Sequence, residues 1–162
     1  MRKVNSHRQR GASTTDLLIW ASIVIIALIF VISKVPDIRY ASNLSKFQSD
    51  ASAISDGAYR WKKMRPNYTG ISINILCTQK YIPESICGTS NNGVSTNSFG
   101  GNWTVTANSN PGLFNIGATI PNDPDRMNDI ADTMAPATRG NCTAASGCST
   151  ITAAGTSLTM TY

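Results

Sequence analysis

The stretch LLIWASIVIIALIFVIS, residues 17–33, decides the fold of this chain. It carries no charge, and its only hydroxyl side chains belong to Ser22 and Ser33. As a helix that rises ~1.5 Å per residue it spans roughly 25 Å, the short end of what crossing a bilayer core of ~30 Å requires. Taken alone, the stretch is compatible with a removable signal peptide, a single membrane anchor or a buried core helix.

The residues on either side of this stretch favour a helix that stays in the mature protein. Residues 1–11, MRKVNSHRQRG, hold four Lys or Arg and no acid, and Asp16 and Lys34 bound the apolar run. Basic residues before an apolar helix predict that the N-terminus stays cytoplasmic. A signal-peptide cleavage site would have to lie near residues 40–42, beyond several charges. A buried core helix would leave the basic leader unexplained.

The positive charge of the chain is concentrated in that leader. The formal net charge is +5, and residues 1–11 contribute +4, so residues 12–162 are close to neutral. A nucleic-acid-binding domain shows a basic excess of its own, so nucleic acid is not expected as a direct ligand. Lys62, Lys63 and Arg65 form one local basic cluster, interpreted as the solvated end of a helix.

A second helical pattern follows the apolar stretch. Apolar side chains recur at heptad spacing between residues 40 and 61, and a polar face opposes them. The apolar positions are Tyr40, Leu44, Phe47, Ala51, Ile54, Ala58 and Trp61, and the polar ones are Asn43, Lys46, Ser49, Asp50 and Asp56. Pro36 is expected to loosen the helix, and Pro66 with Asn67 to end it. We predict about 50 helical residues, roughly 75 Å, with the stripe packed on a sheet, a coiled-coil seam being the alternative.

Residues 70–98 look irregular, and strand patterns follow them. Ile71, Ile73 and Ile75 alternate with polar residues, which predicts a short strand or an extended loop. Two alternating runs, residues 103–107 and 114–120, flank the turn SNPG at residues 109–112. Two such runs around a Pro-Gly turn predict an antiparallel hairpin.

The last 40 residues predict a short helix and a terminal strand. Asp123 is expected to cap a helix that starts with Pro124 and that Pro136 closes. Its inward face would be Met127, Ile130, Ala131 and Met134. Alternation over residues 158–162 predicts a final strand.

Four cysteines are present: Cys77, Cys87, Cys142 and Cys148. An even number in a chain with an export-like segment indicates disulfides formed in an oxidising compartment. Three pairings are possible, and the sequence favours the two local ones, 77–87 with 142–148. The cysteine spacings do not suit zinc, and the only histidine, His7, lies in the leader, so no metal site is expected.

No catalytic constellation is apparent. Without a histidine beyond the leader there is no Ser/His or Cys/His nucleophile, and no glycine-rich phosphate loop occurs. The acids between Asp123 and Asp132 are explained by a surface helix face. We therefore expect no enzymatic activity and no cofactor.

The segment RGASTTDL, residues 10–17, resembles the processing site of type IV prepilins. That family has a short basic leader ending in glycine, an acid at the fifth mature residue and then an unbroken apolar run. The resemblance implies that a prepilin peptidase cuts between Gly11 and Ala12 and methylates the new amine of Ala12. The chain departs from the family in having Asp16 where Glu is usual and Ala12 where Phe, Met or Leu is usual.

The acid at the head of the helix has a physical rationale. An unpaired carboxylate costs several kcal/mol to bury in an apolar medium, so Asp16 favours a positive partner. The α-amine of Ala12 on a neighbouring subunit would supply one during assembly. The residues expected to act in assembly are Asp16, Leu17, Leu18, Trp20, Ile23, Phe30 and Pro36.

The order of helix, loop, hairpin, short helix and strand resembles the type IVb pilins, the class of toxin-coregulated, bundle-forming and conjugative thin pili. The resemblance rests on short motifs: Tyr59, YTG at 68–70, FGG at 99–101 and a helix at 121–134 before a cysteine. The resemblance implies an α+β pilin fold, with a long N-terminal helix packed on an antiparallel sheet. Its parts would be a leader (1–11), a hydrophobic helix (12–36), an amphipathic half (37–66) and a globular head (67–162).

The function implied is that of a structural pilus subunit, used for adhesion, motility or conjugative contact. Its partners would be other copies of the chain, the prepilin peptidase, the inner-membrane assembly machinery and the membrane before assembly. It would reside in the inner membrane with a periplasmic head and then in an extracellular filament. A minor pilin, a secretion pseudopilin and a monomeric membrane-anchored periplasmic binding module remain as alternatives.

Overall fold

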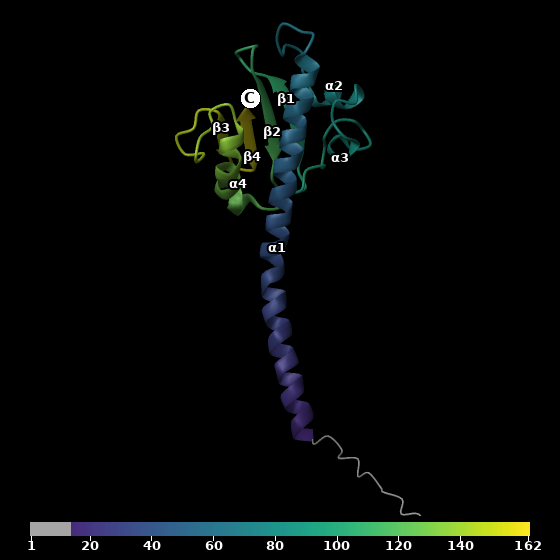
Figure 1. Cartoon of the computed structure of the whole chain (residues 1–162), viewed down its shortest axis with the longest axis vertical. Helices are drawn as coiled ribbons and strands as arrows, with labels where there is room; N and C mark the ends of the chain where they lie inside the picture. Colours follow the sequence, from purple (N-terminus) through teal and green to yellow (C-terminus); the bar gives the residue numbers. More distant parts are fainter. Residues whose placement is uncertain (1–13) are drawn as a thin grey trace, which may run out of the picture. The chain divides into compact units, whose positions relative to one another are not determined.

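The computed structural model describes residues 14–162, which form two compact units divided between Tyr40 and Ala41. The first unit contains the start of α1 (Thr14–Lys62), and none of its described side chains is buried. The second unit, Ala41–Tyr162, holds the remainder of α1, a four-stranded sheet and the shorter helices (Figure 1). Together these elements make an α+β pilin fold, as the sequence predicts.

Helix α1 ends earlier than its sequence pattern suggests. It runs without interruption through Pro36, but it stops at Lys62 and not at Pro66. Two contacts satisfy carbonyl groups of the last turn: the Arg65 guanidinium donates to the Trp61 carbonyl, and the Arg65 amide donates to the Lys62 carbonyl. Since a residue before proline is disfavoured in a helix, the chain leaves the helix before Arg65.

The apolar stripe of α1 packs on the sheet, which confirms that part of the prediction. Phe47 stacks on Trp103 with ring centroids 4.6 Å apart, and Tyr59 meets the edge of Phe114 at 5.5 Å. The buried apolar residues of α1 are Phe47, Ala51, Ile54, Ala58 and Trp61. The polar face differs from expectation at Asp50, which is only 8% exposed.

The sheet has the strand order β1-β2-β4-β3, and every neighbouring pair is antiparallel. β1 (Trp103–Ala107) and β2 (Phe114–Thr119) form the predicted hairpin, in which Val105 pairs with Ile116. β4 (Ser157–Thr161) is the predicted final strand, and it lies next to β2. β3 (Ile151–Ala154) was not predicted, because it buries only one large side chain, Ile151.

A short helix occupies residues 73–78, where the sequence predicted a short strand or an extended loop. α2 (Ile73–Thr78) begins after Ser72, whose hydroxyl accepts a hydrogen bond from the Ile75 amide at 3.3 Å. α3 (Glu84–Cys87) follows it along the chain. The strand prediction was wrong because the N-cap at Ser72 and the burial of Leu76 and Cys77 favour a helical turn, which the three alternating isoleucines cannot outweigh.

The helix after β2 starts differently from its predicted form. A 3₁₀ turn, η1 (Pro124–Arg126), precedes α4 (Met127–Met134), and η2 (Ala135–Ala137) follows it. Asp123 is the N-cap residue and Pro124 starts the turn, as predicted, but the Asp123 side chain makes no capping bond. The Asp123 carbonyl accepts a hydrogen bond from the Arg126 amide at 3.2 Å. The predicted inward face is confirmed, since Met127, Ile130, Ala131 and Met134 are all buried.

The loop before β1 is organised by one buried amide. The Asn97 side chain donates to the Thr119 carbonyl at 2.8 Å and to the Asn102 carbonyl at 3.3 Å. Its oxygen accepts from the Phe99 and Gly101 amides at 3.0 and 2.9 Å. Gly101 passes so close to the Thr119 carbonyl oxygen that a side chain there would collide with it. This approach explains the glycine that precedes the strand.

Candidate functional site

The first candidate site is the apolar surface of α1 between residues 17 and 32. Leu17 is 68% exposed, Trp20 69% and Phe30 69%. The exposed residues are Leu17, Leu18, Ile19, Trp20, Ile23, Val24, Ile25, Ile26, Leu28, Ile29, Phe30, Val31 and Ile32. A soluble monomer rarely exposes a contiguous apolar surface of this extent, so lipid or protein must cover it.

Among residues 14–162, α1 is the single helix long and apolar enough to cross a membrane. No part of its most apolar window is buried, which rules out the buried core helix as an interpretation of this stretch. A signal sequence near an N-terminus would satisfy the same criterion of length and composition.

The polar atoms inside this stretch already have partners. Ser22 donates its hydroxyl hydrogen to the Ile19 carbonyl at 2.7 Å, and Ser33 donates to the Phe30 carbonyl at 2.8 Å. In an apolar medium every polar group needs an internal partner. These two hydroxyls can therefore be covered by lipid or by another helix without a desolvation penalty for an unpaired donor.

The ends of the stretch carry the other predicted positions. Asp16 lies in the first turn of α1, where a negative charge interacts favourably with the helix dipole. Gly11 and Ala12, the predicted cleavage site, lie outside the described residues. Pro36 lies inside α1 and has no amide hydrogen to offer the Ile32 carbonyl, so the helix lacks one backbone bond there.

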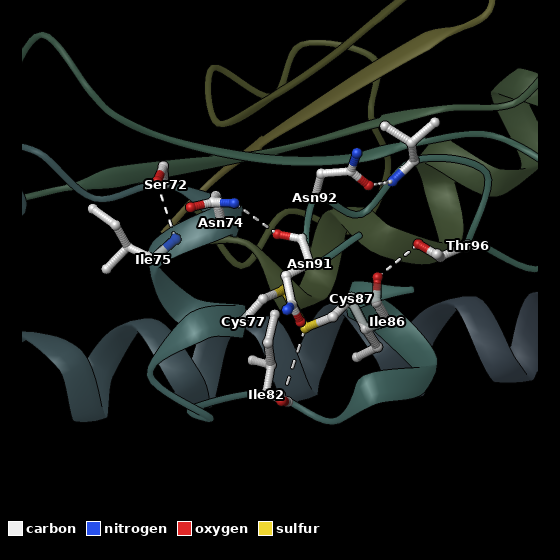
Figure 2. The surroundings of a disulfide bond; sticks show 11 residues. Ser72, Asn74, Ile75, Cys77, Ile82, Ile86, Cys87, Asn91, Asn92 and Thr96 are labelled. Atoms are coloured by element: carbon white, nitrogen blue, oxygen red, sulfur yellow. Dashed lines mark hydrogen bonds between the residues drawn. A yellow bond between two sulfur atoms is a disulfide. The ribbon is translucent and has the colours of Figure 1, made fainter. Parts of the chain in front are cut away.

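Both disulfides are local. Cys77 is bonded to Cys87, and this bridge joins α2 to α3 (Figure 2). Two hydrogen bonds near this bridge connect the following loop to α2 and α3. Asn74 donates to the Asn91 carbonyl at 3.0 Å, and Thr96 donates to the Ile86 carbonyl at 2.7 Å.

The second bridge joins Cys142 to Cys148 in the loop between η2 and β3. These four residues account for every cysteine of the chain, so no thiol is free for metal binding or nucleophilic chemistry. Within the described part of the chain, no cluster of three or more His, Cys, Asp or Glu could hold a metal ion.

Burial raises the pKa of three titratable side chains of the second unit: Asp50, Tyr68 and Tyr162. Burial raises the pKa of Asp50 above 3.8, and the charge of Lys46 partly opposes that rise. Burial also raises the pKa of Tyr162 to about 12, with a further contribution from Tyr59. Sequence reasoning missed Asp50 because a heptad pattern assigns a face to each residue but cannot show whether that face is covered in the folded unit.

A long N-terminal helix packed on a four-stranded antiparallel sheet defines a pilin-like protein. The family model described as PilS N terminal matches residues 41–123, just over half of the chain. The chain belongs to this PilS family, which is pilin-related and associated with the type IV pilus. No curated protein and no solved structure matches the chain. The matched segment starts with the second compact unit and includes α2, α3, β1 and β2.

Proposed function

We propose that this chain is the structural subunit of a type IV pilus of the IVb-like class, polymerised through its apolar N-terminal helix. The observation that carries the proposal is the uncovered apolar surface of α1 over residues 17–32, in a chain whose second unit belongs to a pilin-related family. A surface of this kind requires a permanent cover, and a bundle of identical helices supplies it.

Before assembly the bilayer provides this cover. The basic leader keeps the N-terminus cytoplasmic, so the second unit, Ala41–Tyr162, is periplasmic. An oxidising periplasm suits the two disulfides. In the filament the same side chains pack on neighbouring helices, where apolar burial is worth about 25 cal/mol per Å² relative to water. On assembly, the apolar side chains of α1 therefore move from one apolar environment, the lipid, to another, the helix bundle.

Processing prepares the chain for assembly. Prepilin peptidase cleaves between Gly11 and Ala12 and methylates the Ala12 amine. As the inner-membrane machinery docks the subunit, Asp16 pairs with the Ala12 amine of a neighbour, and Leu17, Leu18, Trp20, Ile23 and Phe30 fill the core. Pro36 is the position where the helix adapts on leaving the membrane. The role is structural and uses no catalytic residue, cofactor or metal.

The test is mass spectrometry of material sheared from the cell surface, combined with electron microscopy of the same sample. Filaments built of a chain that begins at Ala12 support the proposal. A surface-exposed chain that still carries Met1 contradicts it. A membrane-anchored chain that retains residues 1–11 and forms no filament would instead be the monomeric periplasmic binding module. The abundance of the chain in the filament separates a major pilin from a minor pilin or a pseudopilin.

A further inference from the structure

The second unit concentrates positive charge at the end of α1. A pocket of about 370 Å³ lies there, and its lining includes Lys62, Lys63, Arg65 and Arg139 together with Tyr59 and Tyr68. Those four cations are half of the eight Lys and Arg in residues 41–162. Among the residues that the structure describes, no acidic side chain lines this pocket. We call it the basic pocket.

Two of the four cations of the basic pocket, Lys62 and Arg65, lie against aromatic rings. The Lys62 ammonium lies 4.8 Å from the centre of the Tyr68 ring, and the Arg65 guanidinium lies 4.1 Å from the centre of the Trp61 ring. Within residues 14–162 none of the four cations forms an ion pair with a carboxylate. Cations that are fixed on aromatic rings lose little freedom when they bind an anion, so the pocket is prepared for an acidic partner.

The acids of the same unit gather elsewhere. Four of the seven Asp and Glu in residues 41–162 fall on η1 and α4 and at the residue before them: Asp123, Asp125, Asp129 and Asp132. Asp125, Asp129 and Asp132 are all exposed. Asp129 and Asp132 are three residues apart and share one face of α4, and Asp125 lies in η1 directly before this helix. The apolar residues Met127 and Ile130 point into the core. We call these three carboxylates the acidic face.

The basic pocket and the acidic face lie at opposite ends of the second unit. In Figure 1 the end of α1 and the turn between β1 and β2 are at the upper end of this unit, whereas the start of α4 is at its lower end. Opposite charges on opposite ends cannot satisfy each other within one copy. They can do so between copies, and such a head-to-tail contact repeats without closing.

We infer that the basic pocket of one copy binds the acidic face of a second copy along the filament. The inference rests on the proposed polymeric function and adds to it a contact between the globular units. The occupant is argued from charge complementarity: an uncompensated cluster of cations and an exposed stripe of carboxylates occur in the same chain. The contact sets the register of successive subunits, because displacement along the stripe separates the charges.

A charge-swap experiment on the full-length chain tests this contact. Lys63→Glu with Arg139→Glu reverses two exposed cations of the basic pocket, and Asp125→Lys with Asp129→Lys reverses two exposed acids of the acidic face. The yield of sheared filaments is measured relative to the subunit in the membrane fraction. Either reversal is expected to lower the yield about tenfold, because like charges then face each other, and the combined variant restores it. Lys80→Glu, which reverses an exposed cation outside the pocket, is the matched control and leaves the yield unchanged.

The outcomes separate this contact from the proposed function. If the wild-type chain forms filaments but the single-face reversals assemble normally, or if the combined variant is no better than the worse reversal, the contact is wrong. If the wild-type chain forms no filaments, the polymeric function itself fails. Retention of wild-type filaments on heparin, lost in the Lys63→Glu and Arg139→Glu variant while assembly is unaffected, would assign the pocket to an external polyanion and overturn the subunit contact.

Discussion

The ring of Phe47 on α1 stacks on the indole of Trp103 at the start of β1, with the ring centroids 4.6 Å apart. Both side chains are fully buried, and Phe47 also meets the edge of Phe99 at 5.5 Å. Residues more than 50 positions apart in the chain thus share one aromatic cluster. This cluster attaches the second half of α1 to the sheet.

Removal of the Phe47 ring from this cluster should lower the stability of the second unit. Phe47→Ala is expected to lower the free energy of unfolding by about 3–5 kcal/mol, because a buried ring is replaced by a cavity. Thermal unfolding of the detergent-solubilised chain, followed by near-ultraviolet circular dichroism, measures the change. Gln48→Ala alters the next, exposed residue of the same helix and should leave the transition in place. Equal unfolding temperatures for the two variants would contradict the role of the ring stack.

The side-chain amide of Asn97 is expected to contribute about as much to the free energy of unfolding as a buried aromatic ring does. Asn97→Ala leaves the Phe99 and Gly101 amides without their acceptor and removes the donor to the Thr119 carbonyl. Buried groups left unpaired in this way should cost about 2–4 kcal/mol of the unfolding free energy. Denaturant unfolding measures this cost, and Asn128→Ala, at an exposed amide on α4, is the control. A midpoint equal to that of the control would show that water replaces the lost bonds.

Asp50 should make the stability of the second unit depend on pH. Its folded pKa lies above the unfolded value of 3.8, because burial disfavours the charged form. Between the two values the folded state binds more protons, so stability falls as pH rises through that window and is highest below it. Asp50→Asn should remove this dependence and stabilise the chain at neutral pH. The measurement is the denaturant midpoint across pH, with Asp56→Asn, an exposed acid of the same helix, as the control. An unchanged pH profile in Asp50→Asn would refute this assignment.

Long periodic patterns predicted their helices and strands well, because many side chains in each pattern fall on the same face. The stripe from Phe47 to Trp61 and the alternation over residues 103–107 and 114–119 are examples. Short elements were missed where one local contact decides. Ser72 caps α2 against the alternation of its isoleucines, and β3 carries a single large apolar residue.

Of the two candidate sites, one could be predicted from the sequence and the other could not. The apolar surface over residues 17–32 is continuous in the sequence, so its extent could be predicted from composition alone. The basic pocket could not be predicted, because Arg139 and the β1–β2 turn reach the end of α1 only in the folded unit. Lys62, Lys63 and Arg65 looked like a solvated helix end for this reason. In the subunit contact inferred above, they act together with Arg139, which is distant in the chain.

The acid at the head of α1 provides the sharpest test of assembly through the helix. Asp16→Asn removes the charge and keeps the size of the side chain, so membrane insertion and cleavage after Gly11 should be unaffected. Without an ion pair to the Ala12 amine, docking loses a favourable contact in an apolar setting, and a loss of about 1.4 kcal/mol per subunit corresponds to a tenfold lower yield. Mass spectrometry of the membrane fraction reports cleavage, and the yield of sheared filaments reports assembly. Asp56→Asn, which changes an acid of α1 outside the apolar stretch, should match the wild type. A full yield of filaments from Asp16→Asn would show that the helices assemble by apolar packing alone.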